Sequence, residues 1–117
     1  MSGTYLVAYN RTRARELAPR VELADGLRSR LVGLLGRSAL GRGEGLWLVP
    51  CSQVHMFFMR FPIDVVFLDA KGRVLQVVRE LRPWRVSPWV RGAHSALELP
   101  AGGAAGVVDA GDVLEMR

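Results

Sequence analysis

The stretch from Pro50 to Asp69, PCSQVHMFFMRFPIDVVFLD, decides the fold of this 117-residue chain. Its second half, residues 63–68, is apolar except for Asp64, and after that residue apolar side chains fall on both faces of an extended strand. A strand of this kind is covered on both sides. Residues 69–72, Asp-Ala-Lys-Gly, then have the composition of a tight turn. We therefore predict a β-hairpin in which residues 73–81 form the partner strand.

Outside this hairpin, short strand-like runs alternate with turns. They lie at residues 4–9, 20–24, 46–49, 93–99 and 113–116, which gives about seven strands in all. After Asp25, leucines at helical spacing predict a short amphipathic helix over 26–35, which ends at Gly36. The glycine-rich run 101–106 is one helical turn or a loop. The predicted fold class is mostly β (α+β), a compact barrel-like or sandwich sheet of about seven strands with one short helix.

The size and composition of the chain indicate one small soluble domain over residues 1–117. Half of the residues are hydrophobic, and a chain of this length can bury a core without disulfides or metals. Cys51 is the only cysteine, so no intramolecular disulfide can form. No stretch approaches the roughly 20 apolar residues of a membrane span, and the first twenty residues lack a cleavable signal. We expect a cytoplasmic protein, unless a natural leader has been removed.

The net charge of +5 is concentrated at the N-terminal end. Residues 1–43 hold eight arginines against Glu16, Glu22 and Asp25, whereas the basic and acidic groups of the remaining chain cancel. Such a front could bind nucleic acid or an acidic partner. Because no recognised nucleic-acid motif accompanies the charge, we favour an arginine-rich solvated surface over nucleic-acid binding.

The central stretch resembles the signature of the bacterial and archaeal "domain of unknown function 192" family. Further similarities lie at 30–37 (RLVGLLGR), 43–46 (GEGL), 97–102 (LELPAG) and at Gly111-Asp112, so that the resemblance covers nearly the whole chain from about Val21 onward. The resemblance implies a compact β-rich domain. It supplies no established activity, cofactor or catalytic residue, so the candidate residues are argued from their own chemistry.

Asp64 and Glu98 are the first candidates, because each is a carboxylate within an otherwise apolar strand. Burying a lone carboxylate is unfavourable, so Asp64 requires a partner such as Arg60, backbone N–H groups at the Pro62 bend, or a ligand. If the two strands are neighbours, Asp64 and Glu98 could converge for acid–base chemistry or cation binding. The structural alternatives are a hydrogen-bond acceptor at Asp64 and an arginine-paired rim carboxylate at Glu98.

Cys51 and His55 form a second candidate pair, as nucleophile and base or as metal ligands. In an extended strand four residues span roughly 13 Å, so the pair requires a turn between them. A metal would need more ligands, and His94 is the only other histidine. We therefore expect an inert Cys51 and no metal or cofactor, and we leave the role of His55 open.

A dense sulfur–aromatic patch surrounds these residues, consisting of Met56, Phe57, Phe58, Met59 and Phe61. Alternation cannot bury all five on one side, so some line a pocket, lie under a loop, or face a partner. Trp84 and Trp89, in a proline-rich connector, could cover the same region, with Arg85 and Arg91 at its rim. An ordinary core shielded by a covering loop is the alternative.

The hypothesis we favour is a binding module for a small amphipathic molecule or a peptide at residues 51–64. Its candidate ligand-binding residues are His55, Met59, Arg60, Asp64, Trp84, Arg85 and Glu98. The alternative is a small hydrolase-like enzyme that uses Asp64 with Glu98 or Cys51 with His55, although no recognised catalytic motif is present. The oligomeric state does not follow from the sequence.

Overall fold

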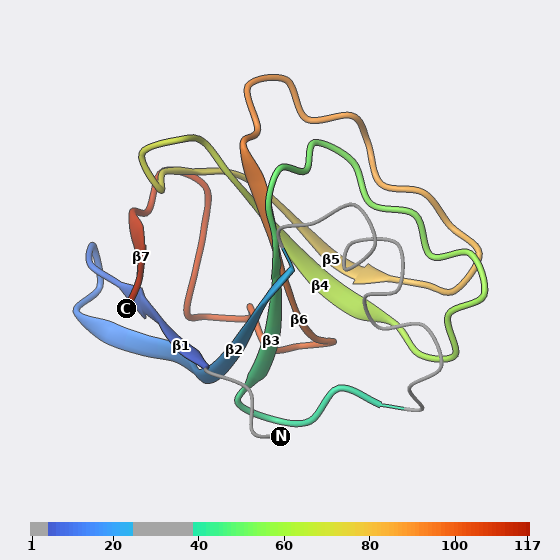
Figure 1. The fold of residues 1–117 in the computed structure, drawn as a ribbon, viewed down its shortest axis with the longest axis horizontal. Coiled ribbons are helices and arrows are strands. Elements are labelled where there is room, and N and C mark those ends of the chain that lie inside the picture. The colour runs from blue at the N-terminus through green and yellow to red at the C-terminus, as the bar shows by residue number, and fades with distance from the viewer. Residues whose placement is uncertain (1–4, 25–38) are drawn as a thin grey trace.

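The structure, a computed structural model, describes residues 5–24 and 39–117, and all seven strands within them join one sheet (Figure 1). The strands are β1 (Leu6–Asn10), β2 (Arg15–Ala24), β3 (Glu44–Leu48), β4 (Ile63–Leu68), β5 (Val74–Leu81), β6 (Ser95–Pro100) and β7 (Leu114–Met116). Their order is β5-β4-β6-β3-β2-β1-β7. Every neighbouring pair is antiparallel except β2 and β3, which run parallel. The mostly β prediction and the hairpin of β4 and β5 are confirmed.

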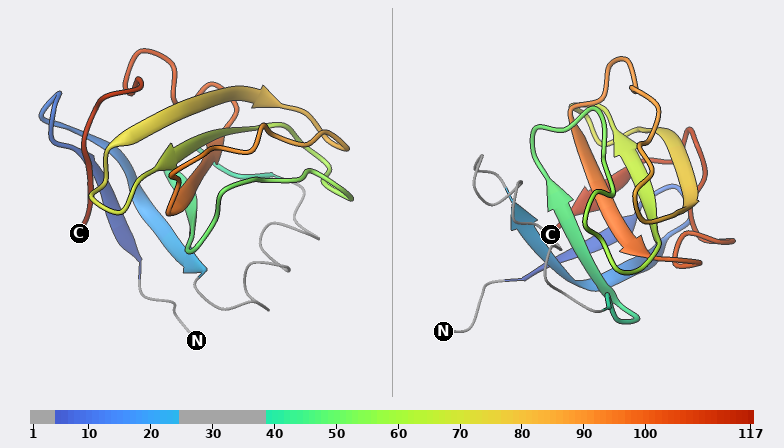
Figure 2. Two further views of the ribbon diagram at one scale, coloured as in Figure 1. Left: turned by 90° about the horizontal axis from the view of Figure 1, so that it is seen from above. Right: turned by 90° about the vertical axis from the view of Figure 1, so that its right-hand side faces the viewer.

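The sheet curls strongly and has the shape of a half-barrel (Figure 2). Its two edge strands approach each other where Arg73, just before β5, bridges Val113, just before β7. The Leu114 N–H donates to the carbonyl of Gly72 at 2.8 Å, and the Val74 N–H donates to that of Asp112 at 2.7 Å. These bonds satisfy backbone groups that would otherwise be unpaired at the sheet edges.

Two adjacent inner strands of the sheet, β4 and β6, carry the core on both faces. All six residues of β4 are buried, as its apolar sequence predicts. On one face, the buried core includes Leu46, Val54, Met56, Met59, Val65, Phe67, Val90 and Ala96. On the other face it includes Val66, Leu68, Leu97, Leu99, Ala104 and Val108. The loops 51–62 and 82–94 therefore cover the first face, and the segment 101–108 covers the second.

The sequence predicts a helix over 26–35 and leaves a helical turn or a loop open at 101–106. The predicted helix over 26–35 lies outside the described residues. The segment 101–106, for which one helical turn was an option, is a series of turns. Gly102 and Gly106 have φ values of +86° and +74°, outside the right-handed helical region, so a helix cannot pass through them. Residues 5–24 and 39–117 contain no helix that could span a bilayer.

The contact of Gly72 with β7 provides a test of the sheet closure. Gly72 has a φ of +88°, and a Cβ built there would lie 2.4 Å from the carbonyl oxygen of Leu114. We expect Gly72→Ala to lower the free energy of unfolding by more than about 2 kcal/mol, through strain and displacement of the edge contact. Gly111→Ala is the matched control, because Gly111 also has a positive φ but nothing within 4 Å of its Cβ position. Urea unfolding measures the free energy of unfolding of both variants. Equal losses in the two would contradict the close contact between Gly72 and the Leu114 carbonyl.

Candidate functional site

Two loops that are distant in the sequence, 51–62 and 82–94, run side by side and project together from the β4–β5 side of the sheet (Figures 1 and 2). Backbone hydrogen bonds join them along their length. Met56 makes two of these bonds at 2.7 Å, donating to the Arg85 carbonyl and accepting from the Trp84 N–H. The Ser87 N–H donates to the Val54 carbonyl, and a single β-bridge pairs His55 with Val86. These hydrogen bonds hold the two loops together, although residues 51–62 form no continuous strand.

The sulfur–aromatic patch divides between the interior and the surface. Met56 and Met59 are buried in the core, whereas Phe57 and Phe58 are exposed and Phe61 is half-buried. The expectation that these side chains cannot all be buried on one side is confirmed. The methionines anchor the loop to the sheet, and the turn at residues 57–58 presents both phenyl rings outward.

Three exposed aromatic rings gather at this turn, and we call Phe57, Phe58 and Trp84 the aromatic tip. The centroids of Phe58 and Trp84 are 4.8 Å apart, and those of Phe57 and Trp84 are 6.3 Å apart. Phe58 is 71% exposed and Trp84 59% exposed. Both have positive φ values, 65° and 69°, a conformation that is unfavourable for bulky residues and that clusters at functional sites. The backbone is thus strained at the two most exposed residues of the tip.

Four arginines lie in the two loops that carry the aromatic tip. Residues 51–62 and 82–94 contain Arg60, Arg82, Arg85 and Arg91, and no aspartate or glutamate. All four side chains are exposed, and among the described residues none of them forms an ion pair.

Three residues of this region, Phe57, Phe58 and Arg82, are not among the ligand-binding candidates predicted from the sequence. The Arg-Pro-Trp-Arg run at 82–85 is the signal that could have drawn attention to Arg82.

Asp64 and Glu98, the predicted carboxylate pair, point to opposite faces of the sheet. Although β4 and β6 are neighbours, Asp64 pairs with Leu99 and Glu98 pairs with Val65. Directly paired residues share a face, so the carboxylates are separated by the sheet itself. The structure does not bring these two residues together.

The Asp64 carboxylate is fully engaged by backbone N–H groups. Oδ1 accepts from Glu80 at 2.9 Å, and Oδ2 accepts from Gly102 and Ala104 at 3.1 and 3.0 Å. The first bond holds an irregularity in β5 opposite Asp64, and the other two hold the 101–106 turns against the sheet. Asp64 therefore acts as a structural acceptor, with donors that lie on β5 and the turns and not at the Pro62 bend.

Glu98 is buried among apolar side chains on the opposite face. It shares that face with Leu46 and Val65, its partners on β3 and β4, and only 6% of its surface is exposed. Removal from water raises the pKa of Glu98 to about 8. The group is therefore mostly a neutral carboxylic acid at pH 7, and the described residues contribute no ion pair to it.

Cys51 and His55 have separate surroundings. The Cys51 thiol donates to the carbonyl of Gln53 at 3.3 Å and packs at the edge of the core. The His55 ring is exposed and stacks on Phe57, with centroids 4.9 Å apart. His55 thus extends the aromatic tip. Among residues 5–24 and 39–117, no group of three or more His, Cys, Asp or Glu side chains is arranged to hold a metal ion.

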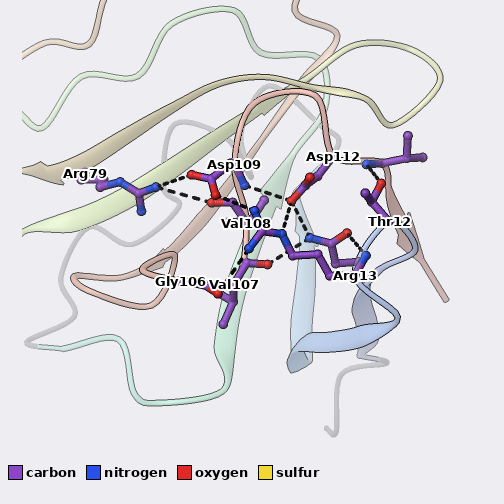
Figure 3. A network of polar contacts seen from close by, with 10 residues as sticks. Thr12, Arg13, Arg79, Gly106, Val107, Val108, Asp109 and Asp112 are labelled. Carbon is purple, nitrogen blue, oxygen red and sulfur yellow. Dashed lines mark hydrogen bonds and ion pairs between the residues drawn. The ribbon is translucent and has the colours of Figure 1, made fainter.

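Two of the N-terminal arginines, Arg11 and Arg13, form ion pairs with the C-terminal segment. The network around Arg13 is shown in Figure 3. Arg13 bridges Asp109 and Asp112, and the buried Asn10 donates to Asp112 at 3.0 Å. Burial alone would raise the pKa of Asp112, but hydrogen bonds from Asn10, the Asp109 N–H and Arg13 together lower it. Arg11 pairs with Glu115. Within the described part of the chain, these arginines join β1 to the C-terminal segment.

Comparison with known proteins places this fold in one family. The family model DUF192, described as "Uncharacterized ACR", matches residues 8–116. A UPF0127 protein of Pyrococcus furiosus is 33% identical over 112 residues, which cover 91% of this chain and 94% of that protein. One from Thermococcus sibiricus is 33% identical over 98 residues, 80% of this chain but only 62% of that protein.

Two solved structures share the fold. A Novosphingobium aromaticivorans protein of unknown function has a TM-score of 0.81 and 27% identity, with 94% of this chain and 83% of that chain covered. A Sinorhizobium meliloti protein, described as a candidate transcription regulator, has a TM-score of 0.82 and 22% identity. The match covers 99% of this chain and 98% of that chain. The second likeness concerns the fold alone. With its match over residues 8–116 and relatives named UPF0127, this chain belongs to the DUF192 family.

Proposed function

We propose that this protein is a non-catalytic binding module that holds an anionic amphipathic molecule at the aromatic tip. The observation that carries the proposal is the strained backbone at Phe58 and Trp84, which keeps two large apolar side chains in water. Exposed apolar groups held in this way are typical of binding surfaces. His55 stacks on Phe57, Arg85 follows Trp84 in the chain, and Arg60 follows Met59, which is buried in the core beneath the tip.

The chemistry of the ligand follows from the two kinds of side chain at the tip. Phe57, Phe58 and Trp84 offer apolar contact, and Trp84 can also donate a hydrogen bond. The neighbouring arginines favour carboxylate or phosphate groups. A molecule with an apolar portion next to an anionic group matches both.

Catalysis has less support than binding. Asp64 is satisfied by backbone donors and is separated from Glu98 by the sheet. Glu98 is buried in the apolar core, and among the described residues no ion pair joins it to an arginine. Neither carboxylate is therefore included in the proposed binding surface.

Decanoate, kept below its micelle-forming concentration, is a suitable probe for the proposal. In an NMR titration of backbone amides, we expect shifts in residues 51–62 and 82–94 and no comparable shifts elsewhere. Decyltrimethylammonium has a similar apolar chain but the opposite charge, and it is expected to bind more weakly. Shifts outside these loops, or equal binding of the two amphiphiles, would argue against the proposal.

Substitutions distinguish the tip from exposed aromatic surface in general. Trp84→Ala is expected to weaken decanoate binding about tenfold, the effect of losing roughly 1.4 kcal/mol of contact. Tyr5→Ala is the matched control, because Tyr5 is 44% exposed and also lies beside an arginine, Arg20, at 4.9 Å. Binding that survives Trp84→Ala unchanged would exclude the tip as the site.

A further inference from the structure

We infer that the aromatic tip docks on the surface of an anionic phospholipid bilayer. This inference rests on the proposed function and names the form in which the anionic amphipathic partner is met. Its evidence is the projection of the rings, the charge of the two loops, and the position of the tip on the molecule.

The rings of the tip project outward. A side chain that lines a pocket is shielded by the opposite wall, but Phe58 is 71% exposed and Trp84 59% exposed. Rings that stand out from the surface can enter a soft, deformable layer. Tryptophan in particular favours the interface between lipid headgroups and hydrocarbon, because its ring is apolar and its N–H is polar.

The charge of the loops complements an anionic headgroup layer. Arg60, Arg82, Arg85 and Arg91 are exposed in two loops that contain no acidic residue. Near a negatively charged leaflet, each basic side chain is expected to strengthen binding about fivefold at low salt. Arginine can also extend its head to the phosphates while its aliphatic stem covers apolar surface.

The loops 51–62 and 82–94, which carry the tip, lie at the end of the molecule opposite β1 and β7 (Figures 1 and 2). Docking there leaves the far end of the sheet, with the Arg13 network, away from the lipid. Insertion of rings and attraction of arginines are two separate signals, and stable membrane attachment generally takes two.

The experiment is co-flotation of the whole protein with large unilamellar vesicles. One vesicle is phosphatidylcholine with about one third phosphatidylglycerol, and the other is phosphatidylcholine alone, since anionic lipid is what attracts basic surface. We expect binding to the anionic vesicles at least tenfold stronger than to the neutral ones, with a large loss at 0.5 M NaCl, where charges are screened within roughly 4 Å. Tryptophan emission should shift to shorter wavelength on binding.

Matched variants locate the contact. Trp84→Ala is expected to weaken vesicle binding about tenfold and to abolish most of the emission shift. Trp89→Ala changes a tryptophan of similar exposure, 69%, that makes no ring contact with the tip among the described residues, and a change of less than about twofold is expected. Arg85→Glu should remove most of the preference for anionic vesicles, whereas Arg15→Glu, an exposed reversal on β2, should not.

The outcomes separate this inference from the proposed function. If decanoate maps to the tip but anionic vesicles do not bind, the bilayer is excluded and the binding module stands. If neither binds, both are wrong. Vesicle binding that is indifferent to lipid charge, or equally reduced by Trp84→Ala and Trp89→Ala, would also overturn the inference. Urea unfolding of each variant verifies that the fold is retained.

Discussion

Replacing Glu98 with Gln is expected to stabilise the protein by an amount that grows as the pH rises from about 4.5 to about 8. The Glu98 side chain lies against Leu46 and Val65 in the core, where its ionised form has lost contact with water. Gln has nearly the same shape and carries no titrating proton. The substitution therefore isolates the ionisation of this one carboxyl.

The sign follows from the pKa of Glu98 in the two states. Burial raises it from 4.5 to about 8 in the folded protein, so the unfolded chain gives up the proton first. Below pH 4.5 both states are protonated, and the stability associated with the neutral group is fully present. Above that pH the unfolded chain ionises, and the free energy of unfolding falls by about 1.4 kcal/mol per pH unit until the folded group also ionises. Over the whole interval the loss is at most about 5 kcal/mol.

Urea unfolding of both proteins at pH 5, 6, 7 and 8 measures this difference. At each pH, the free energy of unfolding of the wild type is subtracted from that of Glu98→Gln. The contributions of the other titrating groups cancel in this difference. Glu22→Gln, which removes an exposed carboxyl from β2, is the control and should stay within about 0.5 kcal/mol of the wild type throughout. Parallel pH profiles for Glu98→Gln and wild type would show that Glu98 is not held neutral by burial.

Alternation of apolar residues predicts much of the sheet, because a strand repeats every two residues. It assigns Ile63, Val65 and Phe67 to one face of β4 and Val66 and Leu68 to the other, and the two core clusters follow that division. The turn at 69–72 is equally local, since Asp69 accepts hydrogen bonds from the backbone of Lys71 and Arg73. These features depend only on residues close together in the chain.

The relation between Asp64 and Glu98 depends on register, which no local pattern contains. The sequence leaves open whether the strands of Asp64 and Glu98 are neighbours. In the structure they are, but a shift of one residue would move Glu98 onto the face of Asp64. The observed pairing of Glu98 with Val65 excludes that arrangement. Likewise, Asn10 and Asp112 are 102 residues apart, and only the order of β1 and β7 in the sheet brings them together.

The aromatic tip was predicted only in outline, because residues 51–62 are mainly loop. Strand alternation does not apply there, so the burial of Met56 and the exposure of Phe58 could not be assigned from the sequence. Their positions depend on hydrogen bonds to residues 82–94, which the chain reaches only after forming the β4–β5 hairpin. The composition of the patch indicates an apolar surface, and the folded topology decides which side chains form it.

Asp64→Asn is expected to lower the free energy of unfolding by about 3 kcal/mol, because a buried carboxylate with three backbone donors loses an acceptor. One of the two oxygens becomes an NH₂ group that faces N–H donors, whichever way the amide is turned. If it faces Glu80, the β5 irregularity loses its support, and Glu80 already has a strained φ of 51°. If it faces Gly102 and Ala104, the turn segment is released from the core.

Asp69→Asn separates this effect from the general loss of a carboxylate. Asp69 also accepts backbone N–H groups, but it is half-buried, so water can replace the bonds and a loss below about 1 kcal/mol is expected. Hydrogen exchange then identifies the failing contact, since the amides of Glu80, Gly102 and Ala104 should lose protection in Asp64→Asn. If the two variants have the same free energy of unfolding, the hydrogen bonds of Asp64 stabilise the fold no more than those of Asp69 in its turn. A larger loss at Asp64 would show that this carboxylate holds both the irregularity in β5 and the 101–106 turns in place, which explains a charged residue in a strand that is otherwise apolar.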